Sequence, residues 1–148
     1  MKLAPLALLT LASLPRTVLT AQEPARAPDP ASVCSLARYL PRAALPPDLV
    51  NIVPDDSLDA PLARTSGPPL QYPVALREAG TEGWVIVGFV VTADGRATAV
   101  QVMASSDSAF APAARATVEG SQYHPPRRGG QAVAAFSCQP VEFHLMKR

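Results

Sequence analysis

Residues 84–104 read WVIVGFVVTADGRATAVQVMA, and this stretch decides the fold. Its first eight residues are almost entirely apolar and rich in β-branched and aromatic side chains, which is typical of a buried strand. The Asp94-Gly95 pair that follows is typical of tight hairpin turns, because glycine adopts the positive φ that they require. The second strand then places Val100 and Val102 on the same face. We therefore predict a β-hairpin over residues 84–104.

Helices are predicted on both sides of this hairpin. Residues 73–79 begin with proline, which fits the first position of a helix, and Gly80 ends them. Beyond the hairpin, residues 105–108 offer helix caps, and apolar residues recur at helical spacing up to Gly120. Residues 131–145 predict one long or broken final strand. The order helix–strand–strand–helix–strand indicates an α+β fold, with two helices packed on one face of a small antiparallel sheet.

The chain begins with the pattern of an export signal. Lys2 is followed by an apolar run of about a dozen residues, and the small residue Ala21 precedes a polar stretch. We predict a signal peptide over residues 1–21. A short uncleaved anchor stays open as the alternative, although a membrane-crossing helix needs roughly 20 apolar residues.

Proline separates the remainder into two parts. Thirteen of the 17 prolines lie at or before residue 73, and proline resists regular structure. We predict a proline-rich irregular segment over residues 22–70 and a folded domain over residues 71–148. Trp84 and Phe89 fall on opposite faces of the first strand, so we expect the proline-rich segment to cover the face that the helices leave open.

Composition and residue spacing argue against several classes of function. The chain is 48% hydrophobic and 17% charged with a net charge of +1, which gives no electrostatic footprint for nucleic acid. Two cysteines and two histidines show no metal-ligand spacing. The residues of a hydrolytic triad occur, but nothing in their spacing brings them together: Ser105, Ser106, Asp107, His124 and His144. We predict no catalytic, metal or cofactor site, and hence no enzyme.

The two cysteines are Cys34 and Cys138. An even number of cysteines in an exported chain predicts a disulfide between them. A bridge closing a loop of about 100 residues would add roughly 4–5 kcal/mol in the chain-entropy model. Two buried or free thiols remain the alternative.

Seven residues of the second half occur in an order and spacing that are specific as a set: Tyr72, Pro73, Gly83, Asp94, Gly95, Tyr123 and Pro125. With the apolar pattern between them, they make the stretch from Tyr72 to Leu145 resemble the TonB C-terminal domain family. Ser121 departs from that pattern, because the family usually carries tryptophan there. The departure puts one packing contact in doubt but not the fold.

The resemblance implies a periplasmic protein-binding module that takes an extended segment of an outer-membrane transporter as an added strand. The last strand is the expected edge, which places the partner along Ala132, Val133, Ala134, Ala135, Phe136, Ser137 and Cys138. Internal pairing, a homodimer, or a cap formed by the proline-rich segment are the alternatives for this strand.

Two roles follow from the resemblance. The first is an energy transducer in transmembrane transport, held in the inner membrane and facing the periplasm if the N-terminus stays uncleaved. The second is a soluble envelope scaffold or regulatory protein that uses the same fold without motor coupling, in one version as a homodimer. No cofactor and no nucleic-acid partner is expected, and membrane contact is expected only through an uncleaved N-terminus.

Overall fold

The structure is a computed structural model that describes residues 26–29, 32–33, 49 and 51–146. The predicted signal peptide and Cys34 lie outside the described residues. The described strands are β1 (Ile52–Pro54), β2 (Arg64–Ser66), β3 (Gly83–Val91), β4 (Ala97–Ser105), β5 (Gln122–Tyr123), β6 (Arg127–Arg128), β7 (Gln131–Ala132) and β8 (Ala134–Phe143). The described helices are η2 (Asp55–Ser57), α2 (Val74–Glu78), η3 (Ser108–Phe110) and α3 (Ala111–Glu119). None of them has the length and apolar character needed to cross a membrane.

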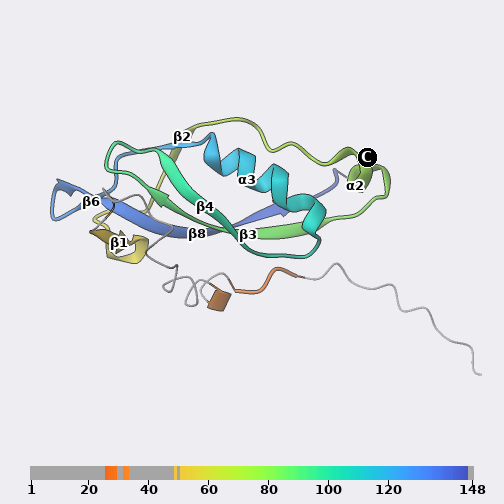
Figure 1. Cartoon of the computed structure of the whole chain (residues 1–148), viewed down its shortest axis with the longest axis horizontal. Helices are drawn as coiled ribbons and strands as arrows, with labels where there is room; N and C mark the ends of the chain where they lie inside the picture. Colours follow the sequence, from red (N-terminus) through yellow and green to blue (C-terminus); the bar gives the residue numbers. More distant parts are fainter. Residues whose placement is uncertain (1–25, 30–31, 34–48, 50, 147–148) are drawn as a thin grey trace, which may run out of the picture.

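The central sheet has the strand order β1-β8-β3-β4. Strand β3 pairs antiparallel with both β4 and β8, and α3 lies across one face of the sheet (Figure 1). Leu76 of α2 and Ala114 and Val118 of α3 pack into the same hydrophobic cluster. The predicted α+β fold is therefore confirmed. The sheet departs from a purely antiparallel one because β1 adds parallel to β8.

Strand β3 runs through the middle of the core. Every residue from Val85 to Val91 is buried, and alternate side chains from Val85 onward join α3 in the main cluster. Ile86 and Val90 point to the opposite face and are also fully buried. A sheet covered on both faces needs such an unbroken apolar strand. In Figure 1, residues 26–29 and 32–33 lie on the side of the sheet away from α3.

The β3–β4 turn differs in detail from a two-residue Asp-Gly turn. Among the described residues, Ala99 is the only non-glycine residue with a positive φ, so the φ of Asp94 is negative. A type I′ turn would require a positive φ at Asp94. The N–H of Gly95 donates to the carbonyl of Thr92 at 2.9 Å, and Gly95 itself has a φ of 91°. The loop is a three-residue type in which glycine takes the left-handed position. A Cβ on Gly95 would also collide with the carbonyl oxygen of Tyr123.

Two three-residue strands, β1 and β2, lie within residues 22–70, which the sequence predicts to be irregular. Strand β2 pairs antiparallel with β5. Arg64 of β2 donates from Nε to Ser121 Oγ at 2.8 Å, and Ser121 Oγ donates to the Thr117 carbonyl at 2.7 Å. Ser121 is buried, and Gly67 lies directly against it. The place where the resemblance predicts tryptophan is thus filled by the proline-rich segment.

The sequence allows a final strand that is either continuous or broken, and the structure shows the broken form. Strands β6 and β7 form a hairpin, and β8 starts again at Ala134 after Val133. The N–H of Val133 donates to the Pro126 carbonyl at 2.9 Å, which continues the β6–β7 pairing by one position before β8 begins. The sequence misses this because a two-residue strand has no usable periodicity.

Candidate functional site

The two edges of the central sheet differ in regularity. The edge formed by β4 is irregular: its register with β3 shifts twice, and Ala99 has a φ of 50° within the second irregularity. Bulges of this kind interrupt the row of backbone donors and acceptors that an added strand would use. The β4 edge is therefore poorly suited to strand addition.

The other long strand is regular. Strand β8 has ten residues and keeps nine consecutive register pairs with β3, from Gly83↔Phe143 to Val91↔Ala135. On its outer side β1 pairs only with Ala134–Phe136. Beyond Phe136, no strand among the described residues pairs with this side of β8. Most of the outer side of β8 is thus a straight edge.

The predicted partner edge, 132–138, falls into three parts. Ala132 belongs to β7 and pairs with Arg127, while Val133 bonds to Pro126. Ala135 and Phe136 already have a strand on each side, and Ala134 pairs with β1 alone, so here the proline-rich segment caps the strand. Only Ser137 and Cys138 fall within the straight edge. Partner binding at residues 132–138 stays a prediction, and the structure adds Gln139–Phe143 to the candidate surface.

A side-chain hydrogen bond marks the point where β1 ends. Ser137 is 1% exposed, and its Oγ donates to Asp55 Oδ2 at 2.6 Å. The parallel register pairs Pro54 with Phe136, so Asp55 stands opposite Ser137 one step further along. A buried hydroxyl needs a partner, and here the partner is a carboxylate from the segment that covers the edge.

A second carboxylate fastens the same segment four residues later. Asp59 Oδ1 and Oδ2 accept the backbone N–H groups of Gly129 and Gly130 at 2.7 and 2.8 Å. The N–H of Asp59 donates to the Arg127 carbonyl at 2.9 Å. The hydrogen bonds from Gly130 and Gly129 lower the pKa of the Asp59 carboxyl below its usual value, and the charge of Arg127 acts in the same direction. The β6–β7 turn is therefore held by an acid of this chain.

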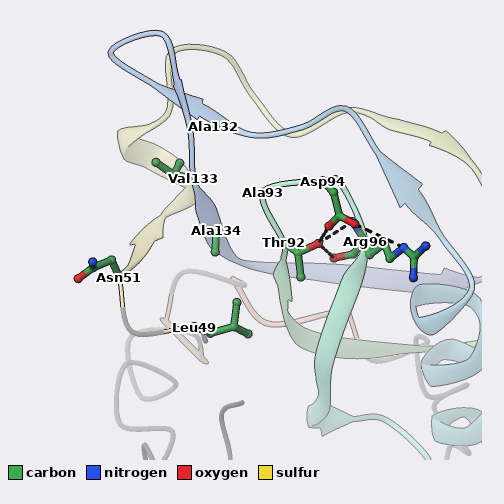
Figure 2. A pocket seen from close by; sticks show the side chains of 9 residues that line it. All are labelled: Leu49, Asn51, Thr92, Ala93, Asp94, Arg96, Ala132, Val133 and Ala134. Carbon is green, nitrogen blue, oxygen red and sulfur yellow. Dashed lines mark hydrogen bonds and ion pairs between the residues drawn. The ribbon is translucent and has the colours of Figure 1, made fainter. Parts of the chain in front are cut away.

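A shallow hollow lies beside the start of β8, at the end of the β3–β4 hairpin (Figure 2). Its wall on the hairpin side is built by a network in which Thr92 Oγ1 donates to Asp94 and accepts from the Arg96 N–H at 3.1 Å. The hydrogen bond from Thr92 lowers the pKa of Asp94. The lining residues are Leu49, Asn51, Thr92, Ala93, Asp94, Arg96, Ala132, Val133 and Ala134. Asp94 therefore stabilises the hairpin turn beside the hollow.

The motif residues of the resemblance support the frame of the domain. The Tyr72 ring meets Phe110 and Phe143 edge-on at centroid distances of 5.9 and 5.6 Å, and its hydroxyl donates to the Thr81 carbonyl. Burial raises the pKa of that hydroxyl. A Cβ on Gly83 would collide with the Phe110 ring.

The other motif residues also act in turns and packing. Pro73 caps α2 and Gly95 makes the hairpin turn, which Asp94 joins through Thr92. Tyr123 packs on Phe89 at a centroid distance of 5.5 Å. Pro125 is exposed in the loop that follows β5.

The residues of the hypothetical triad are engaged separately. Ser106 Oγ accepts from the Trp84 N–H at 2.9 Å, and Asp107 caps η3 by accepting from the Ala109 N–H at 2.8 Å. His144 Nε2 lies 3.0 Å from Glu142 Oε2, and this hydrogen bond raises the pKa of the imidazole. No group of three metal-binding side chains occurs within the described part of the chain.

Cys138 lies partly buried in β8 opposite Gly88 and is not a free thiol. Cys34 is outside the described residues, so the predicted bridge between the two cysteines stays a prediction.

Sequence reasoning missed both carboxylates that fasten the segment before β2. A weak signal exists, since the β-branched pair Ile52-Val53 is followed by Pro54 and two acids. Nothing local indicates that Asp55 meets Ser137, 82 positions away.

The domain is similar to known proteins. Residues 68–145, just over half of the chain, match the family model described as Gram-negative bacterial TonB protein C-terminal. Among solved structures, the solution NMR structure of the Pseudomonas aeruginosa TonB C-terminal domain is similar. It has a TM-score of 0.52 and 31% identity, over 61% of this chain and 92% of that one. No curated protein matches the chain.

Proposed function

Because the chain belongs to the TonB C-terminal domain family, a family of non-enzymatic protein-interaction modules, we propose that it binds an extended segment of an outer-membrane transporter as an added strand. The observation that carries the proposal is the regular ten-residue strand β8, whose outer side beyond Phe136 pairs with no strand among the described residues. Family membership also confirms the prediction that the chain is not an enzyme.

The proposed place of action is the periplasm. The export pattern of residues 1–21 and the envelope setting of the family support it. The intact mass and the cell fraction of the protein in a Gram-negative host test it. Loss of about 21 residues with recovery in the periplasm would identify a soluble member. An intact N-terminus in the membrane fraction would identify an anchored energy transducer.

Strand addition can be tested apart from side-chain recognition. Synthetic peptides copying the N-terminal segments of outer-membrane transporters are titrated into the mature chain and followed by fluorescence anisotropy. Each peptide that binds is then compared with two N-methylated versions, here called the two phases. One phase carries N-methyl groups on the odd-numbered backbone nitrogens, and the other phase carries them on the even-numbered ones. Strand addition requires that one phase fails to bind, because the nitrogens methylated in it are those that would donate hydrogen bonds to β8. The other phase should still bind, because its methylated nitrogens face away from β8.

Two results would contradict this proposal. The first is that no transporter segment binds. The second is that both methylated phases bind like the parent peptide, which would mean that side chains alone carry recognition. Sedimentation at several protein concentrations tests the remaining alternative, a homodimer through β8. The fraction of such a dimer would rise with protein concentration, and the dimer would compete with the peptides for β8.

A further inference from the structure

We propose that β1 occupies, within the chain, the place on β8 that the partner strand takes. The partner must then displace β1 and resemble it, as an extended segment parallel to β8 with β-branched residues followed by an acid. This inference rests on the proposed function, because it takes the β8 edge as the binding surface. It adds that the partner segment runs parallel to β8 and carries an acid, and that β1 of the chain itself competes with the partner for β8.

The register of β1 defines what that place recognises. Ile52, Val53 and Pro54 pair in parallel with Ala134, Ala135 and Phe136. One step further, Asp55 supplies the acceptor that Ser137 needs in its buried position. If β1 leaves, the Ser137 hydroxyl loses this acceptor, so a partner with a carboxylate at the same register position is favoured over one without it.

Strand β1 is attached in a way that permits exchange. It has three register pairs, whereas β3 and β8 share nine. Ile52 and Val53 are only half-buried, and Pro54 is exposed. A partner that continued along β8 to Phe143 would pair with more residues than β1 can, since η2 turns the chain away after Pro54.

Two carboxylates outside β1 hold it in place. Asp55 binds Ser137 immediately after the strand, and Asp59 binds the β6–β7 turn through Gly129 and Gly130. After Asp59 the chain is exposed at Ala60 and Pro61 before β2 begins. Residues 51–59 can therefore leave β8 while β2 stays paired with β5. The two fastenings set the fraction of molecules in which the edge is free.

A tethered strand competes with a free peptide at a high effective concentration. The apparent dissociation constant of the peptide is the intrinsic constant divided by the fraction of free edge. Weakening either fastening raises that fraction, so it must tighten peptide binding. A merely structural role for these carboxylates predicts no tighter binding.

The test uses a fluorescein-labelled peptide with the sequence of residues 50–57, VNIVPDDS, and the full mature chain. The variants Asp55→Asn and Asp59→Asn each weaken one fastening. An asparagine at position 55 can still accept from Ser137 but without the charge, and one at position 59 keeps only one of the two acceptor oxygens that bind the β6–β7 turn. Asp56→Asn is the matched control, because it makes the same charge change at an exposed neighbouring acid. Circular dichroism and a thermal melt establish that all four proteins fold.

We expect Asp55→Asn and Asp59→Asn to bind the peptide at least about threefold more tightly than wild type, as the free-edge fraction rises. The Asp56→Asn control should bind like wild type. On the Asp55→Asn protein, a peptide with the Asp55→Asn change should bind more weakly than the parent, because it cannot offer Ser137 a carboxylate. Equal affinity of wild type, Asp55→Asn and Asp59→Asn for the parent peptide would overturn the inference.

Transporter peptides separate this inference from the proposed function. Equal binding of a transporter peptide to wild type and both opened variants would overturn the competition by β1 and leave the proposed function standing. If no transporter peptide binds any variant, the proposed function fails, while the affinities for VNIVPDDS still decide whether β1 occupies an exchangeable site. Tighter transporter binding by both opened variants is the result that the inference expects.

Discussion

Replacing Phe110 with alanine is expected to destabilise the domain by about 4 kcal/mol, because truncating a buried phenylalanine costs ~3–5 kcal/mol. Phe110 is fully buried, and its ring lies 4.4 Å from that of Phe143 and 5.9 Å from that of Tyr72, centroid to centroid. Each aromatic pair contributes ~0.5–1.5 kcal/mol of the total. A Phe110→Leu variant keeps most of the apolar volume but loses both ring pairs, so it should cost about 1–3 kcal/mol.

Urea unfolding followed by the fluorescence of Trp84, the single tryptophan, measures both variants. A domain of about 80 residues has a total stability of roughly 4–12 kcal/mol, so Phe110→Ala should remove from about a third of it to all of it and lower the urea midpoint in the same proportion. Val74→Ala is the control, since Val74 is 57% exposed and its truncation should stay within ~0.5 kcal/mol. The reasoning would be refuted by a Phe110→Ala cost under about 1.5 kcal/mol, far below the usual cavity cost. It would equally fail if the leucine and alanine variants were equally stable.

Three further predictions concern the turns and the proline-rich segment. Gly95→Ala should cost about 2 kcal/mol or more in urea unfolding, since the residue combines a φ of 91° with backbone contact to Tyr123. Ser121→Trp, which restores the residue usual in the family, should destabilise this chain by about 1–3 kcal/mol, because Gly67 occupies the space. Hydrogen bonds from Gly130 and Gly129 hold the pKa of the Asp59 carboxyl below its usual value, so its hold on the β6–β7 turn is present above the usual pKa of an aspartate and is lost as the pH falls through the lowered pKa. Amide shifts of Gly129 and Gly130 should follow that titration in NMR spectra.

Each of these three has a contrary outcome. A neutral Gly95→Ala would mean that the turn rearranges freely. A stabilising Ser121→Trp would mean that the segment before residue 70 gives way without cost. Glycine amide shifts that titrate at or above the usual pKa of an aspartate carboxyl would contradict the lowered pKa of Asp59. Asp59→Asn supplies the control, because its spectrum should lack the titration.

Much of the fold was predictable because it depends on sequence patterns within short segments of the chain. The hairpin follows from a β-branched run on either side of a glycine turn, and the helix before Gly120 follows from its caps and apolar spacing. The candidate site was predictable only as the last strand beside the hairpin. Its usable length was not, because neither the three-residue strand β1 nor the two-residue strands β6 and β7 has detectable periodicity.

The sequence by itself determined which segments become β3, β4, β8 and α3, because these choices depend on periodicity and on turn residues close together in the chain. Only the tertiary structure decided which edge of the sheet is regular, and that β1 lies along part of it. Those features depend on contacts such as Asp55 with Ser137 and Asp59 with Gly129, which join positions 82 and 70 residues apart. A carboxylate in a proline-rich stretch is locally indistinguishable from a solvated one. Its partner is fixed only when the packed sheet brings the two segments together.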